Sequence, residues 1–198
     1  MKTEMRKELE STGANLYLIG FMGVGKSAVG RSAARMLRMR FLDSDHCIEE
    51  AQGRSISDIF AQDGEASFRR MERAFIESGH PSNGTVVACG GGLPIEPGMR
   101  ELLLQRGVVI CLFANPETIL ERTSGNARRP LLNVEDPKDR IRRLLDEREK
   151  VYMRTGIGIS ADGRSLQDVV SNVVRVYRRE AKSWKAPVGM QTNGGRGK

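Results

Sequence analysis

A glycine-rich run that ends in lysine and serine, GFMGVGKS, occupies residues 20–27. It fits the pattern GxxxxGK[ST], in which backbone N–H groups cradle phosphates, the lysine reaches the β- and γ-phosphates, and the hydroxyl ligates Mg²⁺. A strand-like apolar stretch precedes the run and a helix-like stretch follows it. This order places the glycines at a helix N-terminus, where partial positive charge attracts phosphate. We therefore predict a P-loop that binds a nucleoside triphosphate with Mg²⁺, formed by Gly23, Val24, Gly25, Lys26, Ser27 and Ala28.

Two carboxylates follow the next apolar run, residues 41–43. Asp43 and Asp45 are two positions apart, and alternate side chains of an extended chain point the same way. Open α/β sheets bind ligands at the carboxyl ends of their strands. On its own such a pair more often serves a turn or a helix cap. Because this pair accompanies a phosphate-binding loop, we interpret both carboxylates as facing the nucleotide.

Three consecutive glycines, Gly90, Gly91 and Gly92, follow the strand-like run 85–89. Glycines in this position either form a flexible turn or allow the backbone to approach a ligand closely. The residues alone leave both interpretations open.

Arginines recur where the chain leaves regular structure or lines a helix face, namely Arg69, Arg122, Arg128, Arg129 and Arg148. Most surface arginines only interact with water. Phosphoryl transfer, however, depends on positioning and on cations that offset charge on the transferred group. An arginine near the phosphates is therefore expected.

Strand-like runs alternate with helix-compatible segments, which indicates an α/β fold with a parallel sheet between helices. The strand-like runs are residues 16–19, 41–43, 85–89, 108–113 and 156–160. Segment Glu65–Ser78 carries an apolar stripe formed by Phe68, Met71 and Phe75, which predicts an amphipathic helix. Its polar face includes Arg69.

Two segments do not fit the core of such a fold. Residues 124–137 have no apolar periodicity and carry turn formers at both ends, so we predict a mobile lid. Residues 44–62 are short helical material inserted after the second strand, where a small second substrate could lie beside the phosphates.

Composition is that of a single globular domain: 198 residues, of which 39% are hydrophobic and 29% charged. No stretch reaches the roughly 18 apolar residues of a membrane span, and the first fifteen residues contain no apolar signal core. We expect a cytoplasmic protein without a membrane partner. Cys47, Cys89 and Cys111 form no CxxC pair and are expected as reduced thiols. No cysteine and histidine spacing resembles a metal cage.

Net charge is +7, and most of it lies at the C-terminus. From Arg175 onward the chain has seven basic residues and a single acidic one, Glu180, so this part carries a net charge of +6. Basic termini are usually only solvated, and we predict no nucleic-acid partner. The expected organisation is a single domain over residues 1–182 and a disordered basic tail over 183–198.

Six motifs in order resemble those of the shikimate kinase family: GFMGVGKSAVGR, FLDSD, GEASFR followed three residues later by Glu72, VVACGGG, ARRPLL and LLDERxxxY. The resemblance runs from about Leu16 to Val174. It implies a three-layer P-loop kinase fold with a five-stranded parallel sheet, a lid and an inserted substrate-binding region. It also implies an ATP- and Mg²⁺-dependent enzyme that phosphorylates the 3-hydroxyl of shikimate for aromatic amino-acid biosynthesis, which we expect as a monomer.

The same resemblance implies roles for individual residues. Ser27 and Asp43 would hold Mg²⁺, and Lys26 and Arg129 would act on the transferred phosphoryl group. Asp45 would accept hydrogen bonds from shikimate hydroxyls or act as a catalytic base. The other implied contacts are Arg69, Gly90, Gly91, Gly92 and Arg148 for shikimate, and Arg122, Arg129 and Arg164 for ATP.

The chain departs from the family pattern at two places. Cys89 precedes the triple glycine where threonine or a similar residue is usual, and Gly156 and Ile157 replace an Ala-Asp pair. The second departure leaves the alignment of Arg164 open. Two alternatives also stay open: a kinase of another small polyol or acid, such as gluconate, and a noncatalytic nucleotide binder that serves as a regulator or scaffold.

Overall fold

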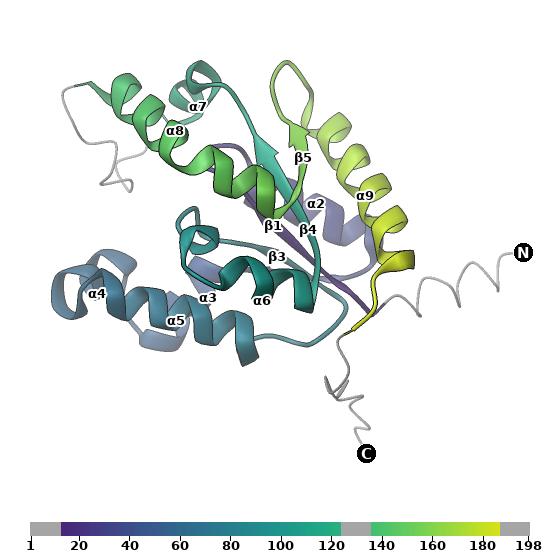
Figure 1. Ribbon diagram of the computed structural model, residues 1–198, viewed down its shortest axis with the longest axis horizontal. Coiled ribbons are helices and arrows are strands. Elements are labelled where there is room, and N and C mark those ends of the chain that lie inside the picture. The colour runs from purple at the N-terminus through teal and green to yellow at the C-terminus, as the bar shows by residue number, and fades with distance from the viewer. Residues whose placement is uncertain (1–12, 124–135, 187–198) are drawn as a thin grey trace, which may run out of the picture.

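The computed structural model describes residues 13–123 and 136–186. Within these ranges a five-stranded sheet lies between two layers of helices (Figure 1). The strand order is β2-β3-β1-β4-β5, and every neighbouring pair is parallel. The strands are β1 (Asn15–Ile19), β2 (Arg40–Asp43), β3 (Thr85–Ala88), β4 (Gly107–Phe113) and β5 (Ile157–Ser160). The fold class and the number of strands predicted from the sequence are confirmed.

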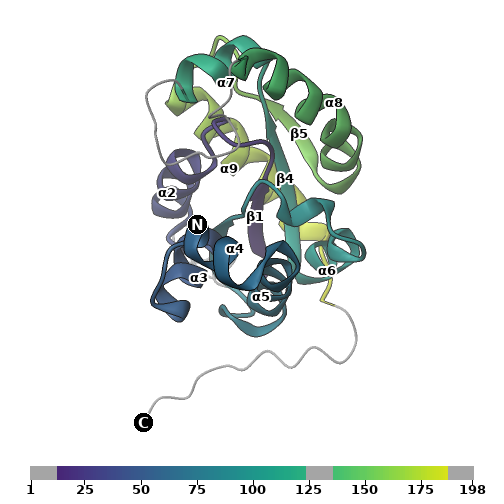
Figure 2. The same cartoon turned by 90° about the vertical axis from the view of Figure 1, so that its left-hand side faces the viewer.

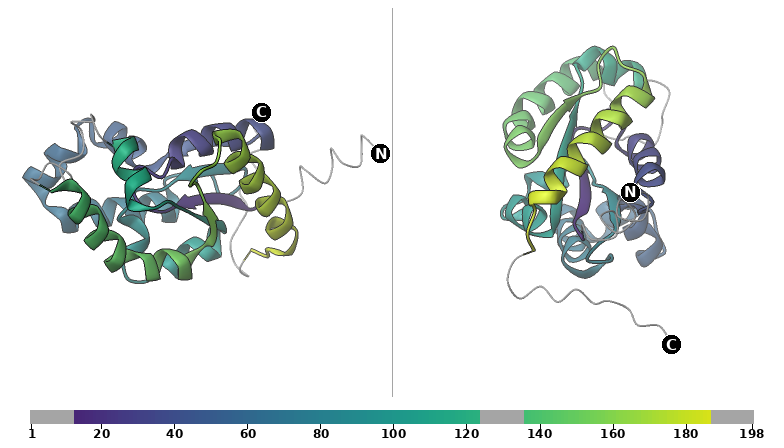
Figure 3. Two further views of the ribbon diagram at one scale, coloured as in Figure 1. Left: turned by 90° about the horizontal axis from the view of Figure 1, so that it is seen from above. Right: turned by 90° about the vertical axis from the view of Figure 1, so that its right-hand side faces the viewer.

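Helices connect the strands in sequence. They are α2 (Lys26–Leu37), α3 (Ser44–Gln52), α4 (Ile56–Asp63), α5 (Glu65–Ser78), the 3-10 helix η1 (Leu93–Ile95), α6 (Met99–Arg106), α7 (Pro116–Thr123), α8 (Pro137–Thr155) and α9 (Leu166–Ser183). Helices α2 and α9 lie side by side on one face of the sheet, and α6 and α8 cover the other face (Figures 1 and 3).

The central strands are buried on both faces, which explains their nearly continuous apolar sequences. All five residues of β1 are buried, as are all four of β3 and the first six of β4. Because side chains from both helical layers pack on these strands, the sheet is a rigid support for the loops at its carboxyl edge. Figure 2 shows α3, α4 and α5 on one side of that edge and α7 and α8 on the other.

Helix α5 has the bounds predicted from its apolar stripe. It begins after Gly64, whose φ of 78° is a left-handed value that favours glycine. Phe68 and Phe75 are buried on its inner face. The segment 44–62 is helical, as predicted, and forms α3 and most of α4.

Three details of the sequence-based prediction are wrong. The extended chain ends at Asp43, and Asp45 lies in the first turn of α3 instead of on a strand. Pro137, predicted as the end of the lid, is the first residue of α8. Helix α9 continues to Ser183, and the indole of Trp184 donates to the carbonyl of Leu104, so residues 183–186 do not belong to a disordered tail. The rest of the predicted lid and tail, 124–135 and 187–198, lies outside the described residues.

All three cysteines are free thiols. Cys89 and Cys111 are buried, whereas Cys47 is half-buried on α3. Within the described ranges, no helix has both the length and the hydropathy that crossing a bilayer requires.

Candidate functional site

The glycine-rich loop joins β1 to α2 at the carboxyl edge of the sheet. Gly25 is the residue before α2 and has φ 100°, and Gly23 has φ 81°. Gly20 has φ 131°, and a Cβ there would collide with the carbonyl oxygen of Leu112. Glycine is therefore required at these turns by conformation or by space. The loop ends at the first amides of α2, and a helix N-terminus of this kind is suited to bind an anion.

Lys26 is held within the curve of this loop. Its ammonium donates to the carbonyl oxygens of Gly20 at 2.8 Å and Phe21 at 2.9 Å. These contacts keep the positive charge beside the amides of the loop, where the phosphates of a nucleotide would lie. The contact of Lys26 with the phosphates themselves stays a prediction.

Ser27 and Asp43 meet next to the loop. The hydroxyl of Ser27 donates to Oδ2 of Asp43 at 2.6 Å, although the two residues are 16 positions apart. Hydroxyl and carboxylate oxygens suit Mg²⁺, which keeps most of its coordination for water and phosphate. No group of three or more His, Cys, Asp or Glu residues that could hold a metal occurs in the described part of the chain. The pair therefore fits Mg²⁺ bound together with a nucleotide better than a metal caged by protein alone.

Asp45 points from the first turn of α3 toward the triple-glycine turn. A Cβ added at Gly90 would lie 2.5 Å from Oδ1 of Asp45, and the amide of Gly90 donates to Oγ of Ser44 at 2.8 Å. Burial and, second to it, the nearby charge of Asp43 raise the pKa of Asp45 to about 6, although Lys26 opposes the shift. A half-buried carboxylate with a pKa near 6 is suited to accept a proton near neutral pH.

Glu72 is a second acid at the same turn, and the sequence reasoning assigned it no role. Its side chain is buried, and Oε2 accepts from Nη1 of Arg69 at 2.6 Å. The other oxygen, Oε1, has no hydrogen-bond partner and would lie 2.7 Å from a Cβ at Gly90. Burial raises the pKa of Glu72 to about 7 in spite of the contact with Arg69. The i, i+3 spacing of Arg69 and Glu72 was the sequence signal for this pair.

Arg69 projects from α5 toward Gly92. A Cβ at Gly92 would lie 2.5 Å from Nη2 and 2.7 Å from Cζ of Arg69. The guanidinium also contacts Glu65, Glu72 and Glu96. The triple glycine thus leaves space for the acidic side chains at Gly90 and for the guanidinium at Gly92, and the close approach of a ligand to this turn stays a prediction.

We expect Gly92→Ala to raise KM for the anionic substrate about tenfold, because the new methyl group would displace the Arg69 guanidinium. Steady-state kinetics would measure this change. Gly13→Ala is the matched control, since its Cβ would meet only the Asn83 Cβ at 3.7 Å. An unchanged KM in Gly92→Ala would show that the guanidinium position does not depend on this glycine.

Arg148 lies on α8 beside Tyr152, which contacts the same turn. Its guanidinium hydrogen-bonds the side chain of Tyr152, one helical turn further on, and the Tyr152 hydroxyl donates to the carbonyl of Gly91 at 2.6 Å. Burial raises the pKa of Tyr152 to about 12, so the hydroxyl stays protonated. Tyr152 was missed as a site residue, although the motif LLDERxxxY contains it.

Arg122 ties two loops together. It donates to the carbonyl oxygens of Val24 at 3.3 Å and Ala161 at 3.1 Å, and thereby joins the P-loop to the loop after β5. Arg164 is exposed on that second loop and is not brought to the triple glycine. Arg128 and Arg129 lie outside the described residues.

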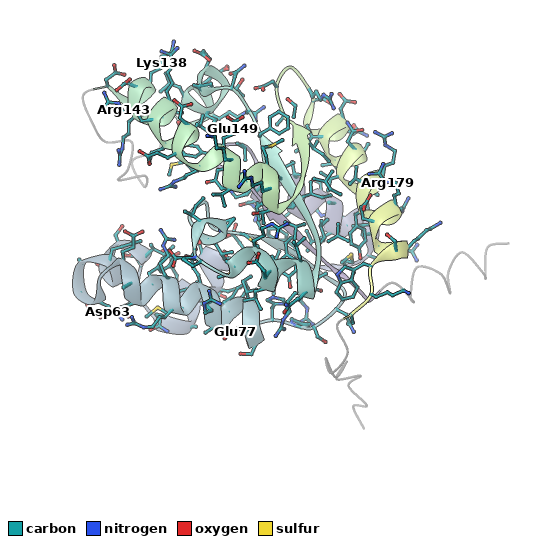
Figure 4. The ribbon with its side chains drawn as sticks, viewed as in Figure 1. Asp63, Glu77, Lys138, Arg143, Glu149 and Arg179 are labelled. Carbon is teal, nitrogen blue, oxygen red and sulfur yellow. The ribbon has the colours of Figure 1, made fainter. Side chains whose placement is uncertain are left out.

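A cavity of about 460 Å³ adjoins the P-loop beneath α8. Phe21 and Val24 of the P-loop, the end of β4 and the inner side of α8 line it, and Tyr152 separates it from the triple-glycine turn. Figure 4 labels Glu149, one of its lining residues, on α8.

Comparison with known proteins agrees with the motifs. A family model described as shikimate kinase matches residues 22–178. The chain is 44% identical to a shikimate kinase from Thermus thermophilus over 179 residues, which cover 90% of this chain and 97% of that protein. The structure of shikimate kinase from Acinetobacter baumannii in complex with shikimate matches with a TM-score of 0.81 and 36% identity, covering 88% of this chain and 97% of that one. A gluconokinase from Sinorhizobium meliloti matches over 87% of this chain and 95% of its own, but with a TM-score of 0.53 and 16% identity it shares the fold alone.

Proposed function

Because the chain belongs to the shikimate kinase family, we propose that it transfers the γ-phosphoryl group of ATP to the 3-hydroxyl of shikimate, giving shikimate 3-phosphate and ADP. The observation that carries this proposal is the convergence of Asp45, Arg69 and Tyr152 on one glycine turn beside the P-loop, with Arg148 next to Tyr152. Shikimate has a carboxylate at one end and hydroxyls at the other. The turn offers guanidinium groups for the first and a carboxylate for the second.

The P-loop holds the phosphates of ATP in this proposal, and Lys26 contacts the β- and γ-phosphates. Ser27 and Asp43 would hold Mg²⁺. When bound, Mg²⁺ supplies positive charge that neutralises the phosphate oxygens. The described residues contribute the loop amides, the ammonium of Lys26 and two oxygen ligands.

Asp45 is proposed as the proton acceptor. As the bond between the shikimate 3-oxygen and the γ-phosphorus forms, the bond from that phosphorus to the ADP oxygen breaks, and the hydroxyl proton passes to Asp45. The raised pKa of Asp45 favours this transfer near neutral pH. Glu72 holds Arg69 in place through its buried oxygen.

Arg148 and Arg69 are proposed to bind the shikimate carboxylate. Tyr152 fixes the distance between α8 and Gly91, so it positions Arg148 relative to the turn. Gly90, Gly91 and Gly92 keep the turn narrow enough for the substrate to approach the backbone.

The remaining assignments come from the family resemblance. Arg129 is proposed to contact ATP from the lid, and Arg122 and Arg164 to lie near the adenine. A monomeric cytoplasmic enzyme without nucleic-acid or membrane partners belongs to the same proposal.

The test compares acceptors by the release of ADP. We expect shikimate to stimulate ADP release strongly, gluconate to have little effect, and the neutral methyl ester of shikimate to be a much poorer acceptor. The ester lacks the charge-assisted hydrogen bonds that the carboxylate would make to the two arginines, each worth about 1.5 to 3 kcal/mol, so kcat/KM should fall about thirty-fold or more. Equal turnover of acid and ester would contradict the assignment of Arg69 and Arg148. Nucleotide binding without any acceptor-dependent ADP release would favour the noncatalytic alternative.

A further inference from the structure

Three carboxylates surround the guanidinium of Arg69. Glu72 Oε2 lies 2.6 Å from Nη1, Glu65 Oε1 lies 2.6 Å from Nη2, and Glu96 Oε1 lies 3.5 Å from Nε. The Arg69 side chain is only 16% exposed. The guanidinium that we propose binds the substrate carboxylate therefore already contacts three carboxylates of the protein itself.

The three acids differ in how firmly they are held. The Glu72 side chain is 1% exposed, whereas those of Glu96 and Glu65 are 35% and 66% exposed. Ion pairs at the surface are weak because water competes for both partners, but removing one partner of a buried pair is costly. Glu72 is thus a permanent partner of Arg69, and Glu65 and Glu96 can leave it.

The two exposed acids occupy the same edge of the guanidinium. Nε and Nη2 together form one bidentate edge, which matches the two oxygens of a single carboxylate. Glu65 and Glu96 each use one nitrogen of this edge, and Glu72 uses the nitrogen on the other side. One incoming carboxylate could replace both contacts without disturbing Glu72.

We propose that Glu65 and Glu96 are internal competitors for the substrate carboxylate: they occupy the Nε and Nη2 edge of Arg69 in the free enzyme and leave it when shikimate binds. This inference rests on the proposed function. Glu65 and Glu96 thereby set the affinity for shikimate without touching the transferred phosphoryl group.

The test uses Glu65→Gln and Glu96→Gln. Each should lower KM for shikimate about two- to fivefold and leave kcat unchanged. The expected change is below tenfold because an exposed ion pair is weak, and a tenfold change in a binding constant requires about 1.4 kcal/mol. The shikimate methyl ester, which has no anion to compete, should show no such change. Glu101→Gln is the matched control, since the Glu101 side chain is exposed and pairs with Arg100 instead of Arg69.

Glu96→Asp separates direct contact from long-range charge. Aspartate keeps the charge but is one methylene shorter, so it would not reach Nε. It should behave like Glu96→Gln if contact matters, and like wild type if only the field of the charge matters; the second result would overturn the proposal.

Calorimetric titration of shikimate into the nucleotide-free protein completes the test. Two- to fivefold tighter binding by the Gln variants is expected. Normal turnover of shikimate by wild type, together with unchanged or weaker binding in both variants, would overturn this inference and leave the proposed function standing. No shikimate binding and no turnover by wild type would overturn both.

Discussion

Replacement of Lys26 by methionine is expected to abolish phosphoryl transfer. The ammonium sits inside the glycine-rich loop, held by the carbonyls of Gly20 and Phe21, so it adjoins the place where negative charge shifts during transfer. Methionine has a similar length and no charge. The loss of one preorganised electrostatic contact of this kind reduces kcat by about 10²- to 10³-fold. Because Lys26 lies inside the phosphate-binding loop, we expect a reduction at the upper end of this range.

The measurement is ADP release in the presence of saturating shikimate. Lys150→Met, a change at an exposed lysine of α8, is the control for loss of charge. Because Lys26 also ties down the loop, the thermal midpoint of the variant and its shikimate binding should be measured to show that it is folded. If the folded variant kept more than about a tenth of wild-type activity, Lys26 would not be the phosphate-contacting cation.

The features predicted correctly are those that depend on short stretches of chain. The glycine-rich loop needs consecutive left-handed turns at a helix start, and only a local glycine pattern provides them. Strands buried on both faces need apolar runs, and α5 needs one apolar stripe. Each of these constraints lies within about fifteen residues, so each leaves a readable mark.

The surroundings of Arg69 could not be predicted in the same way. Glu65 and Glu72 are its neighbours on α5, but Glu96 comes from the segment after η1 and only the fold brings it to Nε. Tyr152 and Gly91 are likewise 61 positions apart, and their hydrogen bond depends on how α8 packs against the sheet. Side-chain contacts between elements follow from tertiary packing, which no local pattern specifies.

The misplacement of Asp45 has a local cause. Extension of β2 through Ser44 would have put Asp43 and Asp45 on one side of a strand. Instead α3 starts at Ser44, and the acidic side chain of Asp45 lies in its first turn, where the helix dipole favours negative charge. The two carboxylates therefore face different partners: Asp43 meets Ser27, and Asp45 meets Gly90.

Substitution of Asp45 by asparagine should lower kcat about 10²-fold, in line with the loss of a general base. Asparagine keeps the shape and one acceptor oxygen but cannot take up the hydroxyl proton. If kcat barely changed while KM rose, Asp45 would only position the substrate. Asp63→Asn, on α4, is a control for loss of an acidic group near the inserted region.

The pH dependence gives this prediction its sharpest form. Burial raises the pKa of Asp45 to about 6, and the base acts only when it is deprotonated. Wild-type kcat/KM should therefore increase with pH, with an inflection at about pH 6. Asp45→Asn should lose this inflection, and any inflection that survives near pH 7 would belong to Glu72, whose pKa is about 7.

The effect of Asp45 ionisation on stability has the opposite sign to its effect on activity. Because the folded protein holds the proton of Asp45 more tightly than the unfolded chain, ionisation of Asp45 destabilises the fold as the pH rises from about 4 to 6. Asp45→Asn should therefore melt at a higher temperature than wild type at pH 7.5, and a lower midpoint would show that the carboxylate is held for stability and not for proton transfer.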